Sequence, residues 1–462
     1  MATLEQTEAS VPKRRGMGMG TIVLVAALAM LLLLAAVFTI GSLVSIRQLD
    51  AELAKLRAAG QPVTAADLDA LYAFPPKERD TTELWLGAFA VLDSPAYGND
   101  AADLPDVGEG GAVPPPGEPW PQLEAAEAFL AKYRDPLAKM HRASEPGGEA
   151  RFPLTFSAGD GAVASALLPH IQHVRGAVRL LKLESEVHIR RNDPHAAAES
   201  VRAIFAAARS FERQPLFVSQ LVRVAMNGVA CSQIERFLPA SDFPEQDLLA
   251  FDRDLAAIDE AAALRRALLG TRAMGIGQFE DPSILGPHAS PTRRWRPLRN
   301  IDELAYLKLM EKLVAASQSR RLPLRDAIMQ AEEETEAFRS SSTARWRCPI
   351  TYLTMPSWQA LINAVCRTQA RQAAARSAIA IERYRRVHGE APEGLDQLVP
   401  DVLDQPPVDP FDGAPLRYRV DSGGYKVYSI GSDGVDQGGE SGEGGQELDI
   451  VFEIPFERQK RD

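Results

Sequence analysis

The order of apolar and polar positions near the start of the chain predicts a membrane-spanning helix. From Thr21 to Val44 no residue is charged, and Leu, Ala, Val and Ile dominate. A helix of roughly 20 apolar residues crosses a bilayer, so we expect residues 17–45 to form a transmembrane helix. A cleaved signal peptide is the alternative. The length of the run and the lack of an A-x-A cleavage motif after it favour an uncleaved anchor.

The charges that flank this run indicate its orientation. Lys13, Arg14 and Arg15 precede it directly, whereas Arg47 is the nearest basic residue after it. Basic residues are retained preferentially on the cytoplasmic side of a membrane. We therefore expect residues 1–16 to form a cytoplasmic tail. The protein is then a single-pass protein of the inner (cytoplasmic) membrane, with its bulk outside the cytoplasm.

Apolar residues next recur at helical spacing, which predicts an α-helical extracytoplasmic domain over residues 46–356 and a mainly α protein. Thr64 and Asp67 form a capping box ahead of a short helix. From Pro169 onward, alanines at packing positions favour close approach of neighbouring helices, as in a tetratricopeptide-like stack. The other expected helices cover 82–92, 196–211, 216–238, 246–269, 301–319 and 324–340.

One segment of this domain, residues 99–121, lacks the helical pattern. It is dense in Pro, Gly and acidic residues and contains few apolar ones. Such a composition is typical of a surface loop or linker. We expect a disordered insertion here, and a lid over a binding site is the alternative.

Beyond Ser357 the pattern changes from one long helix to short strands. Apolar residues keep helical spacing up to His388 without a Pro or Gly, and Gly389 supplies a left-handed stop. Residues 416–420, 425–429 and 450–454 then alternate between apolar and polar, which predicts strands. The segment 431–448 between the last two strands holds seven glycines, five carboxylates and no Lys or Arg. Residues 357–462 are therefore expected to form a small α+β domain.

Several spaced motifs in this region carry a family resemblance. In chain order they are Tyr384-Arg385 with Gly389, Gly394-Leu395-Asp396-Gln397-Leu398-Val399, Asp409-Pro410-Phe411, Gly413-x-Pro415-Leu416-x-Tyr418, Tyr428-Ser429-Ile430-Gly431-Ser432-Asp433-Gly434, Gly438-Gly439 and Asp449-Ile450. Together they resemble the periplasmic domain of the major pseudopilin of type II secretion systems. The whole chain also resembles uncharacterised bacterial envelope proteins that end in such a pseudopilin-like tail.

The resemblance implies a long helix packed on a three-stranded antiparallel sheet, with calcium held in the last loop. By position, Asp433 and Asp449 would be its carboxylate ligands, and backbone carbonyls would complete the shell. The residue types agree with this, because Ca²⁺ takes six to eight hard oxygens and glycines let carbonyls turn inward. A solvated, disordered acidic loop is the alternative. The loop is also longer than that of the family, by the stretch 442–445.

The N-terminal segment departs from the pseudopilin pattern. A pilin subunit has a glutamate at the fifth position of its mature helix, whereas this chain has no acidic residue between Glu8 and Asp50. A long helical domain also separates the apolar run from the pilin-like tail. We therefore expect neither prepilin processing nor growth into a filament, and interpret the tail as a module for display or docking.

Composition and motifs exclude several kinds of chemistry. The formal net charge of −11 argues against nucleic acid as a partner. The three cysteines contain no CxxC pair, which argues against zinc, and buried free thiols are expected. The sequence has no H-E-x-x-H, G-x-S-x-G or Walker A motif, and His170 and His173 are interpreted as ordinary helix histidines. The basic cluster around Trp295 is interpreted as a surface loop with internal ion pairs, and contact with anionic lipid is the alternative.

These observations favour a non-enzymatic envelope protein. Its anchor would hold a helical body outside the cytoplasm, and the pseudopilin-like, calcium-binding module would contact a secretion or pilus-type assembly. A membrane-anchored enzyme with its site in the helical body is the alternative, and a ligand-binding sensor is a third hypothesis. A deep pocket lined by converging polar groups with shifted pKa values would favour the enzyme.

Overall fold

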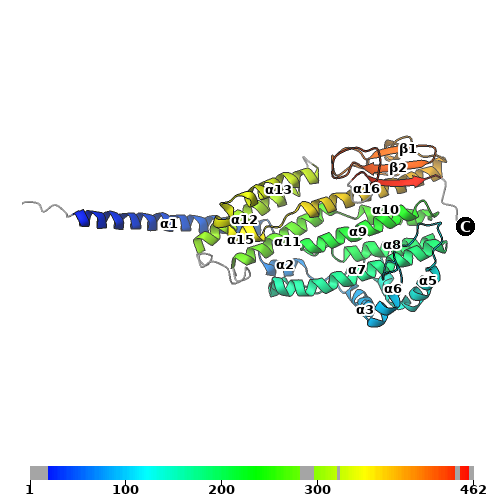
Figure 1. Ribbon diagram of the computed structural model, residues 1–462, viewed down its shortest axis with the longest axis horizontal. Coiled ribbons are helices and arrows are strands. Elements are labelled where there is room, and N and C mark those ends of the chain that lie inside the picture. Colours follow the sequence, from blue (N-terminus) through cyan, green and yellow to red (C-terminus); the bar gives the residue numbers. More distant parts are fainter. Residues whose placement is uncertain (1–18, 281–295, 320–322, 443–447, 457–462) are drawn as a thin grey trace, which may run out of the picture.

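The computed structural model describes residues 19–280, 296–319, 323–442 and 448–456. The protein is mainly helical, with an elongated body from one end of which helix α1 projects (Figure 1). A small sheet lies at the other end of the body. Most of the predicted basic cluster around Trp295 lies outside the described residues.

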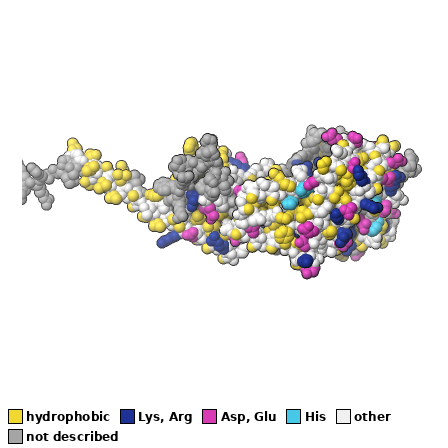
Figure 2. Space-filling model, turned by 90° about the horizontal axis from the view of Figure 1, so that it is seen from below, with side chains coloured by type: hydrophobic (Ala, Val, Ile, Leu, Met, Phe, Trp, Pro, Cys, Tyr) yellow, Lys and Arg dark blue, Asp and Glu magenta, His cyan; other side chains and the backbone are white. Residues whose placement is uncertain are grey.

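Helix α1 (Met19–Ala58) belongs half to the projection and half to the body. Side chains described from Val23 to Val44 are almost all exposed, and hydrophobic side chains cover this part of the helix (Figure 2). Leu49 and Leu56 are buried and share a hydrophobic cluster with Leu304 of helix α12 (Arg296–Ala316). By length and apolar character, α1 is the one candidate membrane span among the described residues. A single helix thus runs from the apolar segment into the core without a linker.

Five short helices follow α1 in the chain. The capping box predicted at Thr64 is present, because Asp67 N donates to Thr64 Oγ1 and the Asp67 carboxylate accepts from Thr64 N. The predicted helix over 82–92 is confirmed as well. The five helices are α2 (Ala65–Leu71), α3 (Thr82–Leu92), α4 (Pro95–Ala101), α5 (Leu123–Lys132) and α6 (Arg134–Ala143).

Three long neighbouring helices form the centre of the body, as predicted. They are α7 (Asp160–Arg190), α8 (Pro194–Arg209) and α9 (Phe217–Phe237), and each packs on the next. Fully buried alanines such as Ala197, Ala203 and Ala207 allow this close approach. The expected start of the first helix at Pro169 is wrong. Helix α7 begins after Gly159, whose φ of 92° ends the preceding turn, and it accommodates Pro169 in its interior.

The segment 99–121 is packed onto this layer, and the prediction of a disordered insertion is wrong. Leu104, Val113 and Trp120 are buried. Arg190 of α7 donates to the carbonyl oxygens of Pro115 (2.8 Å) and Pro114, while Arg236 of α9 donates to that of Val113 (3.0 Å). The guanidinium groups thus satisfy backbone carbonyls that a proline-rich loop leaves without helical partners.

The remaining body helices are α10 (Glu245–Ala256), α11 (Glu260–Glu280), α12 (Arg296–Ala316), α13 (Leu324–Ser340), α14 (Ala344–Arg347) and α15 (Pro349–Thr354). The single helix expected over 246–269 is in fact two. Asp259 separates them, because its Oδ1 accepts from Ala262 N at 2.9 Å and caps the start of α11.

Helix α16 (Gln359–His388) connects the body to the sheet, and Gly389 ends it in the predicted left-handed conformation. Near its start, Trp358 is fully buried against Phe217 of α9, with ring centroids 5.2 Å apart. Near its end, the Tyr425 hydroxyl of the sheet donates to the Ala378 carbonyl at 3.2 Å. One helix therefore packs on both the body and the sheet.

The sheet has three antiparallel strands in the order β1 (Arg417–Val420), β2 (Gly424–Ser429) and β3 (Ile450–Pro455). Tyr425 lies opposite Ile454 and Val427 opposite Phe452, and all four side chains are buried. This confirms the long helix packed on a three-stranded antiparallel sheet. A tetratricopeptide arrangement of the body is not shown.

Candidate functional site

The acidic loop between β2 and β3 holds both predicted calcium ligands. We define the acidic loop as residues 431–449, of which 443–447, with Glu443 and Glu447, lie outside the described residues. Asp433 is exposed near the start of the loop, and Asp449 is buried at its end, next to β3.

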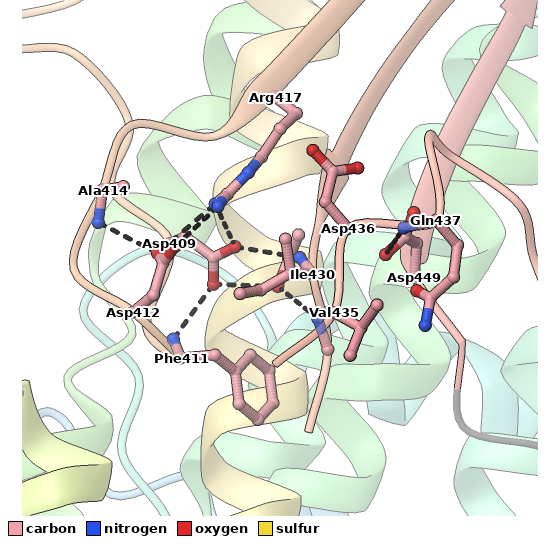
Figure 3. A network of polar contacts seen from close by, with 12 residues as sticks. Asp409, Phe411, Asp412, Ala414, Arg417, Ile430, Val435, Asp436, Gln437 and Asp449 are labelled. Atoms are coloured by element: carbon pink, nitrogen blue, oxygen red, sulfur yellow. Dashed lines mark hydrogen bonds and ion pairs between the residues drawn. The ribbon is translucent and has the colours of Figure 1, made fainter. Parts of the chain in front are cut away.

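The structure brings these two carboxylates to one residue, Gln437. Asp433 Oδ2 accepts a hydrogen bond from the Gln437 side-chain amide at 2.6 Å, and Asp449 Oδ1 accepts one from the Gln437 backbone at 3.4 Å. The other oxygens accept from backbone amides, Asp433 Oδ1 from Val435 (3.0 Å) and Asp449 Oδ2 from Gly439 (2.7 Å). The two predicted ligands therefore both bind the turn 435–439. Figure 3 shows Asp449 next to Gln437.

Two glycines allow the loop to fold back over the sheet. Gly438 and Gly439 have φ values of 80° and 81°, in the region that glycine adopts without strain. A Cβ atom at Gly439 would lie 3.2 Å from the Tyr428 ring. The Gly438-Gly439 pair is therefore needed both for backbone conformation and for close approach to β2.

The electrostatics of the loop are those of an anionic site. Burial raises the pKa of Asp449, and the charges of Asp436 and Asp433 raise it further, whereas the backbone amides of Gly439 and Gln437 lower it. Burial and then the charge of Asp436 likewise raise the pKa of Tyr428. A bound cation would oppose both effects, because it favours ionised carboxylates.

The donor chemistry of the loop fits a hard cation. Asp433, Asp436 and Asp449 offer carboxylate oxygens, and the buried Gln437 Oε1 has no hydrogen-bond partner among the described residues. Oxygen-only ligation of this kind suits Ca²⁺. Within the described ranges, however, no three His, Cys, Asp or Glu side chains are grouped so as to hold a metal. A calcium ion would thus depend on at most two of these three carboxylates together with the amide oxygen and backbone carbonyls, and calcium binding stays a prediction.

Asp409 is a buried residue with partners in three segments of the chain. It has no exposed surface, and its Oδ1 accepts from Phe411 N (3.0 Å) and Ser429 Oγ (2.9 Å). Its Oδ2 accepts from Ile430 N (3.0 Å) and Arg417 Nη1 (2.9 Å; Figure 3). Asp409 therefore joins the 409–413 turn, strand β1 and the end of strand β2. The sequence indicated it only through the Asp409-Pro410-Phe411 motif of the family resemblance.

A groove of about 650 Å³ lies between α16, the α10–α11 junction and residues 403–410. Two polar side chains of α16 that line the groove connect this helix to α10. Gln372 donates to the Leu255 carbonyl (2.6 Å), and Arg376 pairs with Asp252 (2.7 Å). Among the described residues of its lining, Ser377 has the only hydroxyl side chain, which is buried and donates to a carbonyl of its own helix. The described part of this lining therefore offers no nucleophile next to a base.

The histidines make structural contacts in the body. His170 stacks on Phe152 with ring centroids 5.1 Å apart, and His173 Nε2 lies 2.6 Å from Asp93. His141 Nε2 and Ser200 Oγ both lie 2.8 Å from Glu184 Oε2. A carboxylate between the hydroxyl and the imidazole is the wrong order for nucleophilic catalysis, in which the imidazole must contact the hydroxyl.

Comparisons of the chain with protein-family models, with curated proteins and with solved structures find no match. The resemblance to the pseudopilin domain therefore rests on the sequence motifs of the C-terminal region.

Proposed function

We propose that this protein is a single-pass envelope scaffold. Its span α1 holds the helical body outside the cytoplasm, and the body presents the sheet and acidic loop, which we call the head, to another envelope assembly. The role is non-enzymatic, and the partner is a component of a secretion or pilus-type apparatus.

The placement of the head opposite the anchor carries this proposal. α1 enters one end of the body, and the sheet lies at the other end (Figure 1). Helix α16 extends between the two regions and, with 30 residues at about 1.5 Å each, is roughly 45 Å long. A head at this distance from the bilayer reaches partners that a juxtamembrane domain does not.

The rigidity of the connection supports the same reading. Leu49 and Leu56 tie α1 to α12, and Lys55 of α1 pairs with Glu311 of α12 at 2.7 Å. The buried cluster that contains α7, α8 and α9 also contains Val427 and Phe452 of the sheet. Continuous packing from anchor to head suits a scaffold, because it fixes the height and direction of the head.

Calcium would act in this proposal as a structural ligand of the acidic loop, held by Asp433, Asp449 and neighbouring oxygens. Its chemistry would be to neutralise Asp436 and Asp433, whose charges add to the effect of burial in raising the pKa of Asp449. Thermal unfolding of the full chain in detergent tests this, with about 1 mM Ca²⁺ against a chelator. The melting temperature should rise with Ca²⁺ in the parent and not in Asp449→Asn, and an unchanged parent would refute calcium binding.

Site-specific photo-crosslinking tests the scaffold role. A photoreactive residue replaces Val435 in the head, which is 56% exposed, or Leu168 of α7, which is 58% exposed, as a matched apolar control. In cells that produce the protein, the head position should give discrete adducts with envelope proteins, and the α7 position should not. Equal adduct patterns from both positions, or none from the head, would contradict display by the head.

A further inference from the structure

The end of the body that receives α1 carries an exposed basic-aromatic surface outside the head. Ser45 marks the level at which the body begins, because it is the first buried residue of α1 (4% exposed), whereas Val44 before it is 48% exposed. If α1 spans the bilayer, the lipid–water boundary lies near this residue.

Helix α14 lies at that level. A cavity of about 380 Å³ is lined by Ser45 and Gln48 of α1 together with Thr343, Ala344 and Arg347. In Figure 1, α12 and α15, the latter following α14 directly in the chain, are likewise at the end of the body where α1 enters. Residues of α14 are therefore neighbours of the point at which α1 leaves the apolar phase.

The side chains of α14 are unusual for this protein. Trp346 is 84% exposed, whereas Trp85, Trp120 and Trp358, the other tryptophans that the structure describes, are at most 7% exposed. Arg345 and Arg347 on either side of it are exposed, and neither forms an ion pair within the described ranges. In a chain with a net charge of −11, two unpaired arginines around an exposed tryptophan are a local basic patch.

The surface continues onto the first turns of α12. Leu298 and Ile301, each 40% exposed, line a hollow of about 240 Å³ together with Trp346 and Arg347. The combination of tryptophan, partly exposed aliphatic residues and arginines matches the headgroup layer of a membrane. Tryptophan prefers that layer, and arginine binds anionic headgroups while its stem stays in apolar contact.

We infer that Arg345, Trp346 and Arg347, with Leu298 and Ile301, form a foot that rests on the anionic headgroups of the bilayer that α1 spans. The inference depends on the proposed span. Its occupant is the lipid surface, because Ile301 and Arg347 share a cavity with Ser45, where the apolar part of α1 ends, and because the charge of the foot is opposite to that of anionic lipid. The foot would limit tilting of the body about α1 and so fix the direction of the head.

The test uses the full chain in nanodiscs that hold one copy each and contain phosphatidylglycerol. A nitroxide label is placed at Ser342→Cys, an exposed position next to α14, or at Ser422→Cys, an exposed position in the β1–β2 turn of the head. The three native cysteines are buried and should not compete for the label. The accessibility of the label to oxygen, relative to a water-soluble nickel chelate, reports its depth.

We expect the label at 342 to lie at headgroup depth and the label at 422 to lie in water. In phosphatidylcholine alone, and in the variant Arg345→Glu/Arg347→Glu, the label at 342 should move toward water. Each lost arginine should lower the docking equilibrium constant roughly fivefold. Trp346→Ala should weaken docking without removing its dependence on anionic lipid.

Three results would overturn the foot. The first is a label at 342 that is as accessible to the chelate as the label at 422. The second is a depth of the label at 342 that is the same with and without the two arginines. The third is a label at 342 that is shielded only when several copies share a disc, which would indicate a protein partner. A carbonate wash of liposomes that contain the full chain tests the anchor independently of the foot, because the wash removes peripheral proteins and leaves membrane-spanning proteins in place. A chain that the wash removes does not span the bilayer, and the foot then fails together with the proposed anchor.

Discussion

Replacing Asp409 by alanine should destabilise the sheet of the head while leaving the helical body folded. The carboxylate accepts four hydrogen bonds, two of them from the backbone amides of Phe411 and Ile430, which are 3% and 5% exposed. Each buried amide left without a partner costs roughly 1–3 kcal/mol. Arg417 keeps its ion pair with Asp412, so its contribution is smaller.

We therefore expect Asp409→Ala to destabilise the sheet by about 4 kcal/mol, counting roughly 2 kcal/mol for each orphaned amide. Since about 1.4 kcal/mol corresponds to a tenfold change, amides of β2 should exchange with solvent several hundred times faster. Hydrogen exchange of the full chain in detergent, followed by mass spectrometry, measures this. Amides of α8, which belong to the body, serve as the internal reference.

Asp412→Ala is the matched control for this variant. Asp412 is part of the same turn and also contacts Arg417, but it is partly exposed, so its loss should cost less than about 1 kcal/mol. The reasoning fails if Asp409→Ala leaves β2 exchange within a few-fold of the parent. It fails equally if both variants have the same effect, or if α8 amides accelerate as much as those of β2.

Three further predictions concern the body. Gly270→Ala should destabilise the protein by at least about 3 kcal/mol, because its Cβ would overlap the Pro215 carbonyl, whereas Gly277→Ala in the same helix has open space and should be neutral or stabilising in a urea titration. Burial raises the pKa of Glu235 to about 7, so its ionisation opposes folding as pH rises from about 4.5 through 7. Glu235→Gln should therefore be more stable than the parent by about 2–3 kcal/mol at pH 8 and by less than about 1 kcal/mol at pH 5, and equal differences at both pH values would refute this. The three cysteines are buried and burial raises their pKa values, so a thiol reagent at pH 8 should react slowly with the native chain. After unfolding, all three cysteines should react rapidly. Rapid reaction of the native chain would contradict the packing.

Sequence periodicity predicted the elements whose pattern of apolar and polar residues and whose end residues are contained in one continuous segment. Helix α16 has an uninterrupted helical pattern and a glycine stop, and apolar and polar residues alternate over most of the strand segments, so both were predictable. The boundary between α10 and α11 at Asp259 was missed, because in the sequence a helix-capping aspartate within an apolar pattern cannot be distinguished from an exposed polar residue of a continuous helix. The packing of 99–121 was missed because the arginines that hold it, Arg190 and Arg236, are far away in sequence.

In the candidate site, too, some residues were predictable from the sequence and others were not. The resemblance to the pseudopilin domain, rather than the composition of the acidic loop, pointed to Asp433 and Asp449, and the structure places both around Gln437. The role of Asp409 depends on partners from three separate segments, which no local pattern predicts. The exposure of Trp346 likewise depends on how α14 packs, because the sequence alone does not distinguish it from the buried tryptophans.

The most direct test of the central claim is the side of the membrane on which the body lies. A phosphatase that is active only outside the cytoplasm is fused after Gly60, between α1 and α2, or after residue 462, and a fluorescent protein that matures only inside is fused at the same positions. The account predicts phosphatase activity and no fluorescence at both positions, and loss of phosphatase activity when residues 17–45 are deleted. Fluorescence with a silent phosphatase would place the body and head in the cytoplasm and contradict the account.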